Sequence, residues 1–232
     1  MQKPSLLLLP GLLCDETLWA HQIKALKGVA ECHVPDLTRY DTMETLAQSV
    51  LASAPPQFAL AGLSMGGYVA FEILRQAPER VTKLCLLDTS ARPDSEEQKE
   101  KRRAFITMCH VGQFKGVTPR LLPMLINATR LQDKKVTDII YGMAGHVGRD
   151  GFIRQQTAIM SRADSRPLLP LIHCPTQIIC GHQDLLTPPE IMREIAAGIK
   201  GSKMDVIEDC GHLSPLERPE KVSEIMRTWL AV

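Results

Sequence analysis

Residues 60–74, LAGLSMGGYVAFEIL, join an apolar run to a helical pattern through a glycine-rich turn that contains one serine. Gly62, Ser64 and Gly66 fit the Gly-x-Ser-x-Gly pattern of a turn that presents a nucleophilic serine between a strand and a helix. Such a turn strains the backbone at the serine, so the residues two positions away must lack bulk. The pattern is short enough to occur by chance. Its place after an apolar run and before a helical one favours a nucleophile over a plain turn.

Short apolar runs alternate with helical patterns on both sides of this turn. Such alternation predicts an α/β fold, with a mostly parallel, six-stranded, doubly wound sheet covered by helices on both faces. Ligand sites in such sheets lie at the carboxyl ends of the strands. The predicted strands are residues 5–10, 31–36, 57–63, 81–88, 176–181 and 203–209, and the predicted helices between them are 15–26, 42–55, 65–78, 188–199 and 219–230.

The alternation stops between about residues 89 and 167, where every pattern is helical. We therefore expect a core formed by residues 1–88 and 168–232, and a helical cap formed by residues 89–167. Because this insertion leaves the sheet at the carboxyl end of a strand, we expect it to close a substrate pocket. A peripheral helical subdomain is the alternative. The helical patterns within the insertion are residues 94–110, 117–126, 135–147 and 151–162.

Composition narrows the class of protein. The 27 basic and 26 acidic residues nearly balance, so no nucleic-acid partner is indicated. Seven cysteines without a Cys-x-x-Cys pair favour a reducing cytoplasm over a disulfide framework. The apolar run at residues 5–9 is too short for a signal peptide, and no run approaches a membrane helix. We expect a soluble, cytoplasmic protein without cofactor or metal; the oligomeric state stays open.

A serine hydroxyl needs a base to accept its proton and an acid to orient that base. His212, one of seven histidines, lies in the loop between the last predicted strand and the last helix, which suits a presented base. Asp184 follows the preceding strand and is favoured as the acid because that strand should neighbour the one leading to His212. Asp88, at the end of strand 81–88, is the alternative acid, or a turn residue where the chain leaves the sheet.

Two further groups of residues complete the predicted site. The oxyanion should be held by the backbone N–H of Met65, at the start of a helix, and that of Leu12, in the loop after the first strand. Leu13 and Leu185 should flank the serine and give the pocket an apolar wall. A clear basic clamp for a carboxylate or phosphate is missing, although Arg162 and Arg166, where the insertion returns to the core, could supply one.

Three segments resemble those of the α/β-hydrolase-fold serine hydrolases: GLSMGG (62–67), GHQDLLTPPE (181–190) and CGHLSPLERPE (210–220). They are similar to the nucleophile, acid and histidine segments of the branch that holds small carboxylesterases, enol-lactonases and perhydrolase-like enzymes. Many members carry His-Gly where this chain has Pro10-Gly11. The resemblance does not extend to the N-terminal strand pair common in the family, so we expect a trimmed sheet.

The resemblance implies a serine hydrolase that cleaves small to medium carboxylic esters by a Ser-His-Asp acyl-enzyme mechanism, with a small-molecule ester or lactone as its partner. An enol-lactonase or a carbon–carbon bond hydrolase would use the same triad. A perhydrolase or a hydroxynitrile lyase is also compatible with this fold. A non-catalytic ligand receptor of the same fold is the alternative outside the enzymes.

Overall fold

A computed structural model describes residues 3–112 and 114–232, and its central element is a six-stranded sheet. The strands lie in the order β2-β1-β3-β4-β5-β6, and all neighbouring pairs are parallel. The predicted six-stranded parallel sheet is therefore confirmed. The strands are β1 (Ser5–Leu9), β2 (Glu31–His33), β3 (Phe58–Leu63), β4 (Val81–Leu87), β5 (Thr176–Gly181) and β6 (Lys203–Ile207).

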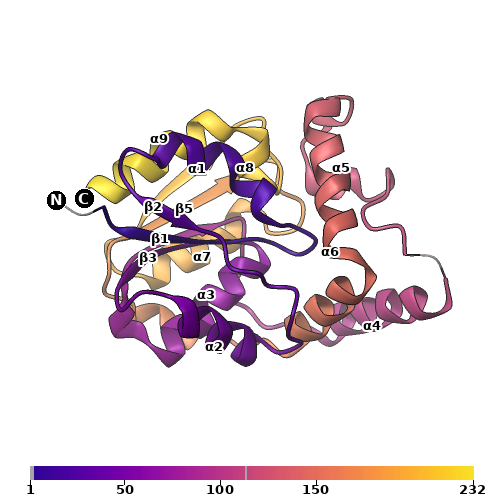
Figure 1. The fold of residues 1–232 in the computed structure, drawn as a ribbon, viewed down its shortest axis with the longest axis horizontal. Helices are drawn as coiled ribbons and strands as arrows, with labels where there is room; N and C mark the ends of the chain where they lie inside the picture. The colour runs from indigo at the N-terminus through magenta and orange to yellow at the C-terminus, as the bar shows by residue number, and fades with distance from the viewer. Residues whose placement is uncertain (1–2, 113) are drawn as a thin grey trace.

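Helices cover both faces of this sheet (Figure 1). Helices α1 (Ala20–Leu26), α8 (Ser214–Glu217) and α9 (Pro219–Ala231) cover one face, and α2 (Met43–Ser53), α3 (Met65–Gln76) and α7 (Pro189–Gly198) cover the other. Leu6 and Leu8 of β1 pack into the first layer, whereas Leu7 and Leu9 pack into the second. All residues of β3 and of β5 are buried, which explains the apolar runs FALAGL in β3 and IIC in β5.

Short 3-10 helices join several of these elements. They are η1 (Glu16–Trp19), η2 (Pro78–Arg80), η3 (Ala128–Arg130) and η4 (Arg166–Leu171). The helix predicted over residues 15–26 is thus η1 followed directly by α1, with the Asp15 side chain capping the first turn.

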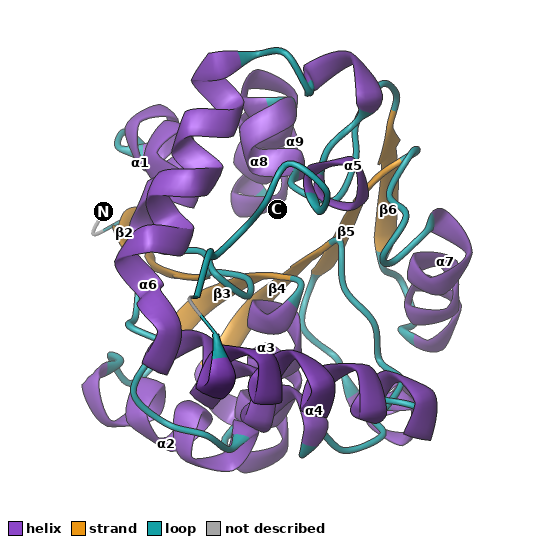
Figure 2. Cartoon of the chain, turned by 90° about the vertical axis from the view of Figure 1, so that its right-hand side faces the viewer, coloured by secondary structure: helices purple, strands orange, loops and turns teal. Residues whose placement is uncertain are grey.

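The segment between β4 and β5 is helical and lies beyond the carboxyl ends of the strands (Figures 1 and 2). It contains α4 (Glu96–Val111), α5 (Leu122–Leu125), η3 and α6 (Lys134–Met160). The helix predicted over residues 117–126 is only the single turn α5. The two helices predicted over 135–147 and 151–162 are joined in α6, which is interrupted at Gly148 (φ 67°, ψ −179°).

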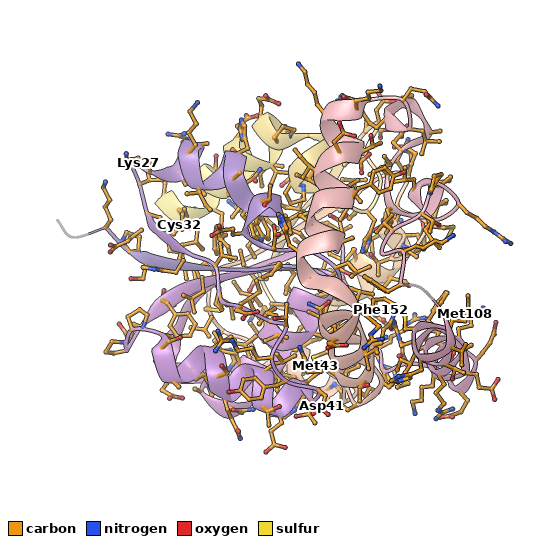
Figure 3. All side chains as sticks on the ribbon, turned by 45° about the vertical axis from the view of Figure 1, so that its right-hand side comes forward. Lys27, Cys32, Asp41, Met43, Met108 and Phe152 are labelled. Atoms are coloured by element: carbon orange, nitrogen blue, oxygen red, sulfur yellow. The ribbon has the colours of Figure 1, made fainter. Side chains whose placement is uncertain are left out.

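This inserted segment shares buried apolar surface with the sheet. Phe152 of α6, labelled in Figure 3, belongs to the same buried cluster as Leu6 and Leu8. Its ring centroid lies 5.4 Å from that of Phe114. Met108 of α4, in contrast, is 64% exposed. The insertion therefore shares the buried cluster mainly through α6, and the mostly exposed α4 contributes only Cys109 to it.

The close approach of α3 to β1 gives a first prediction, made by comparing two glycines. A Cβ at Gly66 would collide with the Leu9 carbonyl, whereas a Cβ at Gly142, exposed in α6, would meet nothing within 4 Å. Gly66→Ala should lower the free energy of unfolding by roughly 2–4 kcal/mol. Gly142→Ala should raise it by about 0.5–1 kcal/mol, because alanine favours the helix. Urea unfolding of both variants checks this, and changes of the same sign would contradict it.

Candidate active site

Ser64 occupies the predicted turn between β3 and α3. Its backbone lies in the left-handed region, at φ 52° and ψ −113°, which a residue with a side chain rarely adopts. Its N–H donates to the Leu87 carbonyl at 3.0 Å, which anchors the turn to the neighbouring strand β4. A Cβ at Gly62 would collide with the Gly66 carbonyl. The turn therefore needs both glycines, and it leaves the Ser64 side chain half-buried at the carboxyl edge of the sheet.

Asp184 and His212 are brought together from the loops that follow β5 and β6. His212 Nδ1 lies 2.8 Å from Asp184 Oδ2, and both residues are buried. Thr187 donates its hydroxyl to the same carboxylate oxygen at 2.7 Å. The N–H groups of Leu186 and Thr187 donate to Asp184 Oδ1 at 2.8 and 3.1 Å. Four donors thus fix the carboxylate, which in turn orients the imidazole.

The charges of this pair stabilise each other. Burial alone would raise the pKa of Asp184, but the positive charge of His212 and the hydrogen bonds from His212 and Thr187 lower it to about 2. Burial alone would lower the pKa of His212. The charge and hydrogen bond of Asp184, with smaller contributions from the charges of Asp88 and Glu217, instead raise it above the usual 6.5. The site is therefore built to favour an imidazolium beside an ionised carboxylate.

Four polar groups at this edge of the sheet make no hydrogen bond to any of the described residues. They are the Ser64 hydroxyl, His212 Nε2 and the backbone N–H groups of Met65 and Leu12. Ser64 and His212 are thus not hydrogen-bonded to each other in this structure. Enzymes often form this contact only when substrate binds. These are the nucleophile, base and oxyanion donors that the sequence predicts.

The loop that carries Leu12 is held by a residue of the inserted segment. Gln155 of α6 is fully buried, and its Oε1 accepts the Leu13 N–H at 3.0 Å. Leu13 itself has φ 59°, so this hydrogen bond stabilises a strained turn. A Cβ at Gly11 would lie 2.9 Å from the Leu63 side chain, so the loop packs closely beside the serine turn. Sequence reasoning missed Gln155, because nothing in GFIRQQTAIM distinguishes it from a surface glutamine.

Asp88, the alternative acid, is directed to other partners. It directly follows β4, has φ 43° and is fully buried. Its Oδ1 accepts the Gly181 N–H at 2.9 Å, and its Oδ2 accepts the Ser214 hydroxyl at 2.5 Å. Burial and the negative charge of Asp184 raise the pKa of Asp88 well above its usual range. Of the two candidate acids, only Asp184 is hydrogen-bonded to His212.

The residues predicted to contact substrate lie in different environments. Leu13 is buried, whereas Leu185 is 61% exposed. Arg162 and Arg166 are already paired with carboxylates, since Arg162 lies 2.6 Å from Asp94 and Arg166 lies 2.6 Å from Asp164. These pairings count against a basic clamp for a substrate carboxylate.

Residues 3–112 and 114–232 contain neither a candidate metal site nor a candidate membrane span. No cluster of three or more His, Cys, Asp or Glu side chains is arranged to hold a metal ion. Within the same part of the chain, no helix combines the length and apolar character needed to span a bilayer.

Comparison with known proteins agrees with this fold. The Alpha/beta hydrolase family matches residues 6–225, so the chain belongs to the alpha/beta hydrolase family. A thermophilic esterase from Thermogutta terrifontis, solved with malate bound, is 34% identical and has a TM-score of 0.92 over 99% of this chain and 90% of that one. The enol-lactonase from Burkholderia xenovorans LB400 has a TM-score of 0.88 at 24% identity over 100% and 93% of the chains, a likeness of fold alone.

One curated protein is also similar to this chain in sequence. The pimeloyl-(acyl-carrier protein) methyl ester esterase of Neisseria meningitidis serogroup C is 26% identical over 192 residues, which cover 81% of this chain and 75% of the relative. The family resemblance expected from the three sequence segments is therefore confirmed.

The electrostatics of the buried pair give a second prediction. NMR titration, with the signal assigned through His212→Gln, should place the pKa of His212 above 6.5, because Asp184 stabilises the imidazolium. Asp184→Asn removes that negative charge while burial remains, so the pKa of His212 should fall. An unchanged pKa in Asp184→Asn would contradict the proposed coupling. Glu220→Gln, which removes an exposed carboxylate, is the matched control and should leave the titration unchanged.

Proposed function

We propose that this protein is a serine hydrolase that cleaves small to medium carboxylic esters through an acyl-enzyme. The observation that carries the proposal is the combination of Ser64 on a strained turn with the buried Asp184–His212 hydrogen bond of 2.8 Å. Each part alone has a structural explanation. Together with two unengaged backbone N–H groups at the same edge, they match the requirements of acyl transfer.

The reaction would run in two steps. His212 Nε2 accepts the Ser64 proton as the serine oxygen bonds to the substrate carbonyl carbon, and the Met65 and Leu12 N–H groups stabilise the oxyanion. The imidazolium then gives its proton to the departing alcohol as the ester C–O bond breaks. Water, deprotonated by His212, then attacks the acyl carbon. The acid is released as the bond between that carbon and the Ser64 oxygen breaks, and the imidazolium returns its proton to Ser64. Asp184 holds the imidazole tautomer with its proton on Nδ1 throughout.

The proposed substrate class rests on similar proteins and on the residues near Ser64. The Thermogutta terrifontis protein and the Neisseria relative are named as esterases, which favours an ester. Leu13 and Leu185 offer apolar contacts, and we propose that residues 89–167 act as a cap on the substrate pocket, with residues 1–88 and 168–232 as the core. Lactones, carbon–carbon bonds, peracids and hydroxynitriles would meet the same catalytic groups, so a substrate panel should include each class.

The nucleophile is tested by covalent labelling. A fluorophosphonate probe should label the wild-type protein once per chain, and Ser64→Ala should abolish the label, because the probe reacts only with an activated serine. Intact-mass measurement reads both results. Labelling that persists in Ser64→Ala, or a wild-type protein that stays unlabelled, would refute the assignment. Turnover of any ester by the wild-type protein would exclude a non-catalytic receptor.

The acid is tested by comparing two buried aspartates. Asp184→Asn should lower kcat for p-nitrophenyl butyrate by about 10²–10⁴-fold, because the histidine loses its orienting charge. Asp88→Asn should lower it by less than about 10-fold, since Asp88 contacts Ser214 and Gly181 rather than His212. Steady-state kinetics on both variants decide between them. The reverse order of losses would make Asp88 the acid.

A further inference from the structure

A second buried carboxylate, that of Glu217, lies beside the histidine loop. Glu217 ends α8 and has no exposed surface. Its Oε1 accepts the N–H groups of Gly211 at 2.9 Å and Leu213 at 3.3 Å, and its Oε2 accepts the N–H of Asn127 at 2.7 Å. A carboxylate without a solvent shell is costly, and here three backbone donors replace that shell.

The residues that Glu217 holds are the two neighbours of His212. Gly211 and Leu213 flank the histidine, so one carboxylate oxygen fixes the backbone on both of its sides. The N–H of His212 itself donates to the Leu125 carbonyl at 3.0 Å. Three successive N–H groups of this loop are therefore satisfied, two by Glu217 and one by the inserted segment.

Glu217 also ties the inserted segment to this loop. Asn127 belongs to that segment, and its side chain donates to Gln183 Oε1 at 3.2 Å. The same Gln183 oxygen accepts the Cys210 N–H at 2.9 Å. The backbones also pack closely, because a Cβ at Gly211 would lie 2.7 Å from the Asn127 nitrogen and 2.8 Å from the Ile126 carbonyl carbon. The histidine loop and residues 125–127 thus form one hydrogen-bonded unit.

We propose that Glu217 is a positioning residue for His212, which holds the histidine loop in register with residues 125–127 of the insertion. This inference rests on the proposed function, in which His212 is the base. The positioning role requires a carboxylate at residue 217, because the three backbone N–H groups around this side chain are all hydrogen-bond donors. An amide would direct its own N–H toward at least one of them. Loss of this hold should move the imidazole relative to Ser64, and a displacement of about 1 Å can slow a reaction by about 10²-fold.

The test compares Glu217→Gln with Glu220→Gln, in which an exposed carboxylate nearby in the chain is neutralised in the same way. Glu217→Gln should lower kcat for p-nitrophenyl butyrate by about 10-fold or more. Its KM should stay within about 3-fold, because Glu217 is buried behind the histidine loop. Glu220→Gln should match the wild type. Circular dichroism and urea unfolding establish that both variants are folded.

The pH profile of kcat/KM distinguishes a positioning role of Glu217 from a role in protein stability alone. Asp184, Asp88 and Glu217 are the charged groups that raise the pKa of His212, so removing one of them should shift the acid limb of kcat/KM to lower pH. A folded Glu217→Gln variant whose kcat and acid limb equal those of Glu220→Gln would overturn the proposal. A wild-type protein that neither hydrolyses esters nor reacts with a fluorophosphonate would instead refute the proposed function.

Hydrogen exchange tests the same unit without any substitution, and decides the matter if Glu217→Gln does not fold. The amides of Gly211, Leu213 and Asn127 share one buried acceptor, so they should open together and exchange with similar protection in the wild-type protein. NMR of the native chain measures each rate. Exchange of Asn127 more than about 100-fold faster than that of Gly211 would show that the insertion is not tied to the histidine loop.

Discussion

The strained turn at Ser64 is the constraint on which the rest of the site depends. A residue with a side chain at φ 52° persists only when its surroundings hold it there. Here the Leu87 carbonyl accepts the Ser64 N–H, while α3 packs so closely on β1 and β3 that positions 62 and 66 have no room for a Cβ. The parallel sheet thus stabilises the turn, and the turn places the hydroxyl at the edge where β5 and β6 deliver their loops.

The electrostatic environment of His212, at the carboxyl edge of the sheet, is set by three buried carboxyl groups. Asp184, Asp88 and Glu217 are each at most 2% exposed, and all three charges favour the protonated form of His212. Only Asp184 bonds to the imidazole. Asp88 is satisfied by Gly181 and Ser214, and Glu217 by backbone N–H groups. One carboxylate therefore orients the ring, whereas Glu217 fixes the backbone on both sides of the histidine.

Sequence reasoning found the features that depend on local order. Ser64, Asp184 and His212 each follow a predicted strand, and the alternation of strands and helices is enough to bring such positions to one edge. Sequence reasoning failed where it relied only on the spacing of apolar residues. The prediction of a helix over residues 117–126 did not take account of Pro123, which lacks an N–H. In the structure only the single turn α5 is helical there. Gln155 and Glu217 could not be found, because their partners lie in other segments and no local pattern marks a buried acceptor.

The inserted segment lies beyond the carboxyl ends of the strands, and it also holds two loops of the candidate site in place. Gln155 of α6 holds the loop that carries Leu12, and residues 125–127 hold the loop that carries His212. Breaking either contact would leave buried donors or a buried carboxylate without partners, a cost of about 1–3 kcal/mol for each neutral group and more for a charge. Motion that admits substrate is therefore expected to spare these two contacts. The outer helix α4 has mostly exposed residues, but its Arg102 donates to the buried Asp94 and Gln156 at 2.7 Å each, so moving the start of α4 would also break buried contacts.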